Sequence, residues 1–313
     1  MDPAIVFFGF GVGFLVGLTG MGGGSLMTPL LVLVFGIKPT TAIGTDIFYA
    51  AITKTAGSWR HLKLRTVNIP LVTWMAIGSV PSAIVGVWVL DILKDRLGDD
   101  LDETVFAILA SCLLVVGVAT LFRALFLAKQ IEERDDFEMH TPHKIAAVGI
   151  GATTGFVIGL SSAGSGTLIA IMLIAVFRLR PQKVVGTDVV HAAILLSAAS
   201  IAHIFSGNVD FGLAGNILLG SVPGVIVGSN LSVKWPQDML RIALGVVLIA
   251  AGITIMNKSD TALVPYGIAI AAVAVGILFA IQIGLRKEVE TDPAEQEWLR
   301  KARAVAVVGD EVP

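Results

Sequence analysis

Residues 20–29, "GMGGGSLMTP", interrupt a long apolar segment near the start of the chain. Residues 4–35 carry no charged side chain, yet this stretch holds four glycines and ends in a proline. Glycine and proline are the two residue types least suited to a helix interior. We therefore predict that a helix breaks here, inside an apolar segment.

The break has a partner further along the chain. A shift of 142 residues aligns "GFLVGLTGMGGGSL" with "GFVIGLSSAGSGTL", "KPTTAIGTDIFYAAI" with "RPQKVVGTDVVHAAI", and "GSVPSAIVG" with "GSVPGVIVG", all without a gap. From Gly9 to Val89 about thirty of roughly eighty positions are identical to their partners. The chain therefore contains an internal duplication with one break in each half.

The composition is that of an integral membrane protein. Hydrophobic residues make up 55% of the chain and charged residues 15%, with a mean hydropathy of +0.85. Long apolar stretches separated by short loops predict an all-α membrane bundle and not a barrel of alternating strands. The stretches lie near 4–35, 69–90, 104–122, 145–177, 212–231, 242–256 and 262–285, with two charge-bearing ones near 41–60 and 182–205.

Positive charge predicts how the halves lie in the membrane. If each Gly-interrupted segment enters and returns as two half-helices, each half crosses three times and the halves are inverted. Seventeen of the 22 Lys and Arg then share one side, which the positive-inside rule makes cytoplasmic. The expected parts are a first membrane repeat (1–128), a cytoplasmic linker (129–144), a second repeat (145–285) and a cytoplasmic tail (286–313), in the cytoplasmic membrane.

The breaks are the first candidate site. A helix that begins inside the bilayer has free N–H groups and a positive dipole end, which together suit an anion. The alternative is that the glycines only let helices pack closely. The expected ligands are in the two breaks: Gly22, Gly23, Gly24 and Ser25, and Gly164, Ser165, Gly166 and Thr167.

Ionisable residues within the membrane form the second candidate site, because such residues usually face a cavity or pathway. Asp46 and Asp188 are equivalent in the repeat, and we expect them to order the broken segments through backbone N–H groups or to carry a proton. For His191 two interpretations stay open: a site residue that carries a proton, or a satisfied interior histidine. Lys54, whose counterpart is Leu196, is interpreted either as an anion ligand or as a counter-ion to Asp46.

Smaller polar residues complete the expected set. Thr45 and Thr187 stand beside the two aspartates as further substrate ligands. His61 and His203 match each other near helix ends, where we expect interfacial histidines.

Other chemistries find little support in the sequence. The single cysteine, Cys112, excludes an internal disulfide and a Cys-based metal cluster. A net charge of −2 gives no reason to expect nucleic acid. We expect no cofactor and no metal, and as partners a small anionic substrate and membrane lipid; a homo-oligomer is compatible with the sequence.

The paired motifs "GLTGMGGGSLMTPLLVLVFGIKPTTAIGTD" and "GLSSAGSGTLIAIMLIAVFRLRPQKVVGTD" resemble the TauE/SafE sulfite exporter (TSUP) family of carriers. The resemblance implies secondary transport of sulfite, sulfonates or related small anions. The second motif departs from the first, with Ser165 in place of Gly23 and Arg178-Leu179-Arg180 in place of Gly36-Ile37-Lys38, so we expect the half-sites to contribute unequally.

The sequence thus predicts a secondary anion carrier and not an enzyme. Two alternatives stay open. One is a proton- or cation-coupled carrier of another solute that uses Asp46 and Asp188. The other is a membrane-embedded redox or enzyme subunit, for which the sequence offers no catalytic cluster at a membrane face.

Overall fold

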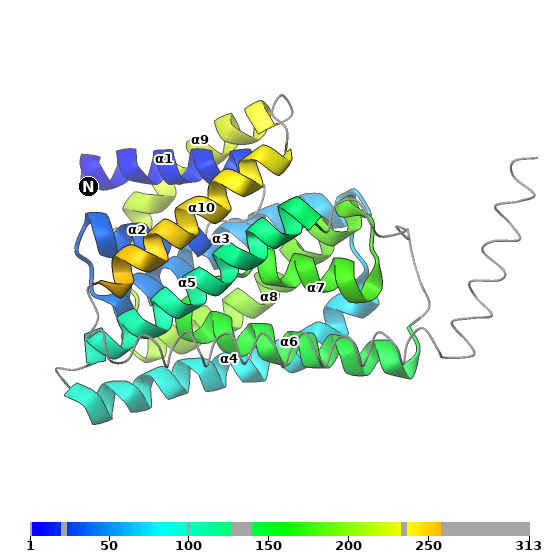
Figure 1. The fold of residues 1–313 in the computed structure, drawn as a ribbon, viewed down its shortest axis with the longest axis horizontal. Helices are drawn as coiled ribbons and strands as arrows, with labels where there is room; N and C mark the ends of the chain where they lie inside the picture. The colour runs from blue at the N-terminus through cyan, green and yellow to red at the C-terminus, as the bar shows by residue number, and fades with distance from the viewer. Residues whose placement is uncertain (1, 20–23, 99–100, 127–138, 233–236, 258–313) are drawn as a thin grey trace, which may run out of the picture.

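The computed structural model describes residues 2–19, 24–98, 101–126, 139–232 and 237–257, and within them the chain is a bundle of ten helices (Figure 1). This confirms the predicted all-α fold. The helices are α1 (Pro3–Thr19), α2 (Gly24–Val34), α3 (Pro39–Lys63), α4 (Ile69–Leu97), α5 (Leu101–Phe126), α6 (Thr141–Ser161), α7 (Thr167–Phe177), α8 (Pro181–Phe205), α9 (Phe211–Ser232) and α10 (Gln237–Met256).

The element order repeats with the sequence, so that α1–α5 correspond to α6–α10. In the described part of the chain six helices are long and apolar enough to cross a membrane: α4, α5, α6, α8, α9 and α10. The apolar stretch near 262–285, the tail 286–313 and most of the linker lie outside the described residues.

The predicted break of the second repeat lies between α6 and α7. Residues 20–23 of the first break lie outside the described residues, between the end of α1 and the start of α2. In the second repeat α6 ends at Ser161, and Ser162 follows in the left-handed region with φ 59°. Its N–H donates to Ile158 O at 2.8 Å, which satisfies one of the carbonyls at the helix end. Gly164, with φ 95°, continues the turn before α7 begins.

The two helices beside the second break differ in length. The helix α6 has 21 residues and is long and apolar enough to cross a membrane. The helix after the break is short, because the 11 residues of α7 span about 16 Å, roughly half of a hydrocarbon core. The second break is thus followed by a helix about half as long as a membrane crossing.

The fourth helix of each repeat, α4 or α9, begins with a capping residue at an equivalent position. Asn68 accepts a hydrogen bond from Leu71 N at 3.0 Å and so caps α4. At the equivalent place Asp210 accepts from Leu213 N at 2.9 Å and caps α9. A side-chain acceptor at this position satisfies a backbone donor that the first turn leaves free, so both repeats begin their fourth helix in the same way.

Glycine-mediated packing joins the repeats in two equivalent layers, α1 on α9 and α4 on α6, which lie side by side in pairs in Figure 1. A Cβ on these glycines would collide with the facing backbone, so only glycine permits the approach. The facing pairs are Gly9 with Ile217, Gly13 with Ser221 and Gly17 with Val225, and in the other layer Gly151 with Met75, Gly155 with Ser79 and Gly159 with Ala83.

These pairs map onto each other by the 142-residue shift, so the two layers are related by a pseudo-two-fold operation. Residue numbers rise together within each layer, which means that the paired helices run parallel. Two further pairs join a helix to its own counterpart, α3 with α8 and α5 with α10, and α4 also packs against α8. The core therefore lies where the two repeats interlock.

The contacts also show near which end of α3 each repeat begins. The start of α1 lies beside the start of α9, which follows the loop that meets Gly44 near the start of α3. The start of α6 lies beside α4, where Lys144 Nζ stands 5.4 Å from the centre of the Trp74 ring. Since α4 follows the end of α3, α1 and α6 start at opposite ends of α3.

Candidate substrate site between the two repeats

The ionisable residues and threonines that the sequence singled out form a buried polar cluster on α3 and α8. The six residues that the sequence singled out there are each at most 7% exposed as whole residues: Thr45, Asp46 and Lys54 on α3, and Thr187, Asp188 and His191 on α8. Buried polar groups need partners, and the partners found here come largely from the opposite repeat.

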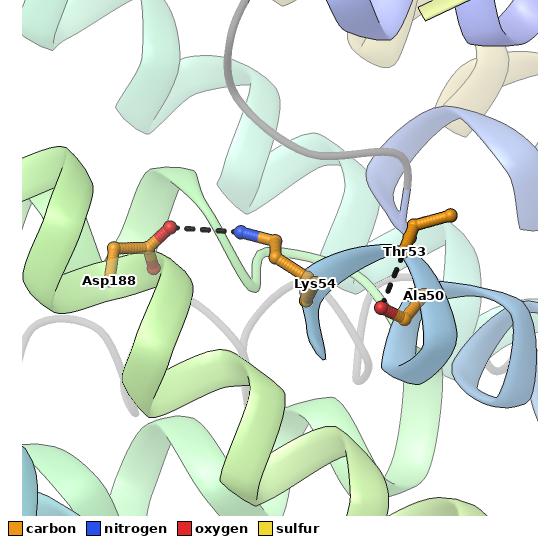
Figure 2. A network of polar contacts seen from close by, with 4 residues as sticks. All are labelled: Ala50, Thr53, Lys54 and Asp188. Atoms are coloured by element: carbon orange, nitrogen blue, oxygen red, sulfur yellow. Dashed lines mark hydrogen bonds and ion pairs between the residues drawn. The ribbon is translucent and has the colours of Figure 1, made fainter. Parts of the chain in front are cut away.

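Lys54 and Asp188 form a buried ion pair across the repeat interface (Figure 2). Lys54 Nζ lies 3.0 Å from Asp188 Oδ2, and each side chain is 8% exposed. Lys54 is therefore a counter-ion, but it pairs with Asp188 and not with Asp46 as the sequence suggested. The hydroxyl of the neighbouring Thr53 donates to Ala50 O of the same helix at 3.1 Å.

Asp46 is held by hydroxyl groups and not by a cation. Its Oδ2 accepts from Thr28 Oγ1 at 2.6 Å and from Ser162 Oγ at 2.8 Å. Thr28 belongs to α2 and Ser162 to the break of the other repeat, so Asp46 connects both broken segments. The side-chain hydroxyls of Thr28 and Ser162 are its main donors, and the backbone N–H of Thr28 also contributes.

The two aspartates are equivalent in sequence but unlike in surroundings. The positions that correspond to Thr28 and Ser162 around Asp188 are Ala170 and Gly20, which have no hydroxyl. The position that corresponds to Lys54 around Asp46 is Leu196, which is fully buried and apolar. The two aspartates therefore differ in the polar residues available to them.

Thr45 and Thr187 hold the loops that lead into α9 and α4. Thr45 Oγ1 accepts from Asp210 N at 3.0 Å, and Thr187 Oγ1 accepts from Asn68 N at 3.1 Å. The preceding glycine of each "GTD" triplet is needed because a Cβ at Gly44 or Gly186 would collide with the same loops. The Gly and Thr of the triplet thus dock a loop from the other repeat.

His191 lies one turn from Asp188 and contacts α4. Its Nε2 is 2.8 Å from Ser79 Oγ, and both side chains are fully buried. The equivalents of this pair are Tyr49 and Ser221, which are also buried. His191 therefore sits at a polar position present in both repeats.

The interpretation of His203 as an interfacial histidine is wrong. Its side chain is fully buried, with Nε2 3.1 Å from Gly159 O and Nδ1 3.4 Å from Asn208 Nδ2. The helix α8 packs against α3 and α4, and Gly159 O of α6 lies beside the ring. His61, its equivalent, is partly exposed and contacts Thr66 Oγ1 at 3.0 Å.

The residues of the second break lie in the interior. Ser165 is 2% exposed and Thr167, the first residue of α7, is 1% exposed, with Gly164 and Gly166 between α6 and that helix. In the first break Gly22 and Gly23 lie outside the described residues. The structure gives the backbone of Gly24 and Ser25 as the start of α2.

Sequence reasoning missed Thr28, Ser162 and Ser79. A signal was available for the first two, because each is a hydroxyl residue whose repeat equivalent has none. Within the described ranges, no group of three or more His, Cys, Asp or Glu side chains could hold a metal ion.

Two interlocked repeats of apolar helices, with broken helices and an ion pair buried at their centre, define a multi-pass membrane protein of the transporter class. The family profile "Sulfite exporter TauE/SafE" matches residues 5–255, and the chain belongs to this family. It is accordingly a membrane transporter and not an enzyme.

Relatives support the class. The chain is 38% identical over 257 residues to the probable membrane transporter protein YjnA of Bacillus subtilis, covering 82% of this chain and 100% of the relative. It is 27% identical to the probable membrane transporter protein YdhB of the same organism, covering 80% and 99%. It is 25% identical to the probable membrane transporter protein MJ0441 of Methanocaldococcus jannaschii, covering 80% and 94%. No solved structure gives a significant match.

Proposed function

We propose that this protein is a secondary carrier of small anions in the cell membrane, with sulfite, sulfonates or related sulfur-containing or organic anions as substrates. The family description supports this substrate class.

The observation that carries the proposal is the buried break between α6 and α7. A short helix that begins in the protein interior directs its first N–H groups and its positive dipole end into a site from which water is largely excluded. Ser165 and Thr167 border this end and are almost completely buried. An anion bound there, between Gly164–Thr167 and the matching Gly22–Ser25, accepts hydrogen bonds from backbone N–H groups of both repeats.

Lys54 supplies positive charge to the same region. Its ammonium group has three donors, and Asp188 accepts one of them. A further donor is available for an anion in our proposal, while Asp188 balances the charge when the site is empty. Thr45 and Thr187 keep the surrounding loops in place and add hydroxyl groups near the anion.

The two repeats are inserted in opposite orientation in this proposal. Support comes from α1 and α6, which start at opposite ends of α3. Basic residues gather where α3 ends and α8 begins: Arg60, Lys63, Arg65, Arg178, Arg180 and Lys183. We assign this end to the cytoplasm on the positive-inside rule, with the linker 129–144 on the same side.

Flux through proteoliposomes tests the proposal. Purified protein is reconstituted, and uptake of radiolabelled sulfite is measured with and without unlabelled methanesulfonate or sulfate as competitors. We expect saturable uptake that methanesulfonate reduces. Uptake of a cation that requires no anion would contradict the proposal, as would sulfite flux equal to that of empty vesicles.

A further inference from the structure

The two equivalent aspartates differ in whether their charge is fixed. Asp188 faces the ammonium of Lys54 at 3.0 Å in a buried place. Protonation of Asp188 would leave a lysine cation without its partner in the protein interior, which is strongly unfavourable. Asp188 therefore stays a carboxylate, and the pair acts as a neutral unit that joins the repeats.

Asp46 has no such cation among the described residues. Its side chain is fully buried, its Oδ2 accepts two hydroxyl hydrogen bonds, and its Oδ1 has no hydrogen-bond partner there. Burial of an ionised carboxylate whose oxygen has no hydrogen-bond partner costs free energy. Protonation lowers this cost because it neutralises the charge. The surroundings of Asp46 therefore accommodate a neutral carboxyl group.

The helix end beside Asp46 acts in the same direction. Ser162, which donates to Asp46, is the C-cap residue of α6. The C-terminal end of a helix carries partial negative charge and disfavours a nearby anion. Because both hydroxyls donate to Oδ2, they keep their hydrogen bonds whether or not Oδ1 carries a proton, so protonation needs no rearrangement.

Tyr49, one turn from Asp46 on α3, is a titratable residue that interacts electrostatically with it. It does not take the place of a counter-ion, because a tyrosine is neutral or negative. The hydrogen-bond partners of Asp46 in the described structure are Thr28 and Ser162.

From these contacts we propose that Asp46, and not Asp188, binds the proton that is transported together with the anion. The inference rests on the proposed function, because it names the coupling ion of that carrier. A negatively charged substrate between the breaks favours protonation of a nearby carboxylate. The proton binds at Oδ1 as the anion enters and leaves from Oδ1 as the anion departs.

Proteoliposomes loaded at different pH test the inference with radiolabelled methanesulfonate, which stays fully ionised and carries no proton of its own. For one proton per anion, a gradient of about one pH unit drives about tenfold accumulation in the wild type. We expect Asp46→Asn to lose this accumulation but to retain exchange of labelled for unlabelled anion, since the Asn carbonyl still accepts from Thr28. Asp95→Asn, an exposed change on α4, is the matched control.

Accumulation driven by pH in Asp46→Asn would overturn the inference, as would accumulation that follows a sodium gradient and ignores pH. Infrared difference spectra between two pH values give a second readout that needs no substrate. We expect a titrating protonated-carboxyl band that Asp46→Asn removes and that Thr28→Ala moves to higher wavenumber, because the carbonyl loses a hydrogen bond. Lack of this band in the wild type would overturn the inference, whereas lack of all anion flux would contradict the proposed function alone.

Discussion

Lys54 of the first repeat and Asp188 of the second form a buried ion pair, with Nζ and Oδ2 3.0 Å apart, although 134 positions separate them in the sequence. The pair joins α3 to α8 at the point where the helices of the two repeats meet. Its geometry makes Lys54 both a structural residue and the one buried cation of the proposed site within the described residues.

Removal of one partner of this pair should destabilise the protein more than removal of both. We expect Lys54→Leu or Asp188→Leu alone to cost about 3–5 kcal/mol, because each leaves an unpaired buried charge. The double variant should recover most of that loss, since Leu196 already occupies the position equivalent to Lys54. Thermal unfolding in detergent measures the effect, with the exposed Lys63→Leu as control.

Additive losses in the double variant would show that the two charges do not interact. Transport gives a separate outcome. The double variant should fold but bind anion weakly, because the proposed lysine donor is gone. A fully active double variant would remove Lys54 from the site.

Two glycines of α1 should differ in how much a substitution destabilises the protein. Gly13 lies against the backbone of Ser221, whereas a Cβ at Gly11 would meet nothing within 4 Å. We expect Gly13→Val to separate α1 from α9, with a cost of at least the roughly 1–3 kcal/mol typical of overpacking. Gly11→Val should leave the yield of folded protein and its melting temperature nearly unchanged. Equal behaviour of the two variants on size-exclusion chromatography would argue against this interface.

Cysteine labelling in a Cys112→Ala background tests the proposed orientation. Single cysteines at Arg65 and Gln182 should react with a membrane-impermeant reagent from the same side, and a cysteine at Asp95 should react from the opposite side. All three positions are exposed. Reaction of Arg65→Cys and Gln182→Cys from opposite sides would refute the inverted insertion.

The sequence predicts the features that obey the repeat and misses those that break it. The helix breaks, the buried aspartates and the all-α fold follow from local patterns that occur twice. The pairing of Lys54 with Asp188 could not be predicted, because it depends on how α3 lies against α8 in space. The burial of His203 depends in the same way on tertiary contacts, which include Gly159 O of α6 and Asn208, and not on its place near a helix end.

The contact between Asp46 and Ser162 shows a further limit of sequence reasoning. Each residue was close to a motif, but only the interlocked packing brings the third helix of one repeat to the break of the other. A comparison of the two repeats for polar residues without a polar equivalent would have identified Thr28 and Ser162, although not their common partner.

The most direct test of the central claim is flux of radiolabelled sulfite into proteoliposomes, measured beside vesicles that contain the Gly13→Val variant or no protein. The account predicts saturable sulfite uptake by the wild type that unlabelled methanesulfonate competes against. Uptake no faster than in empty vesicles, with protein that is shown to be folded and inserted, would contradict it.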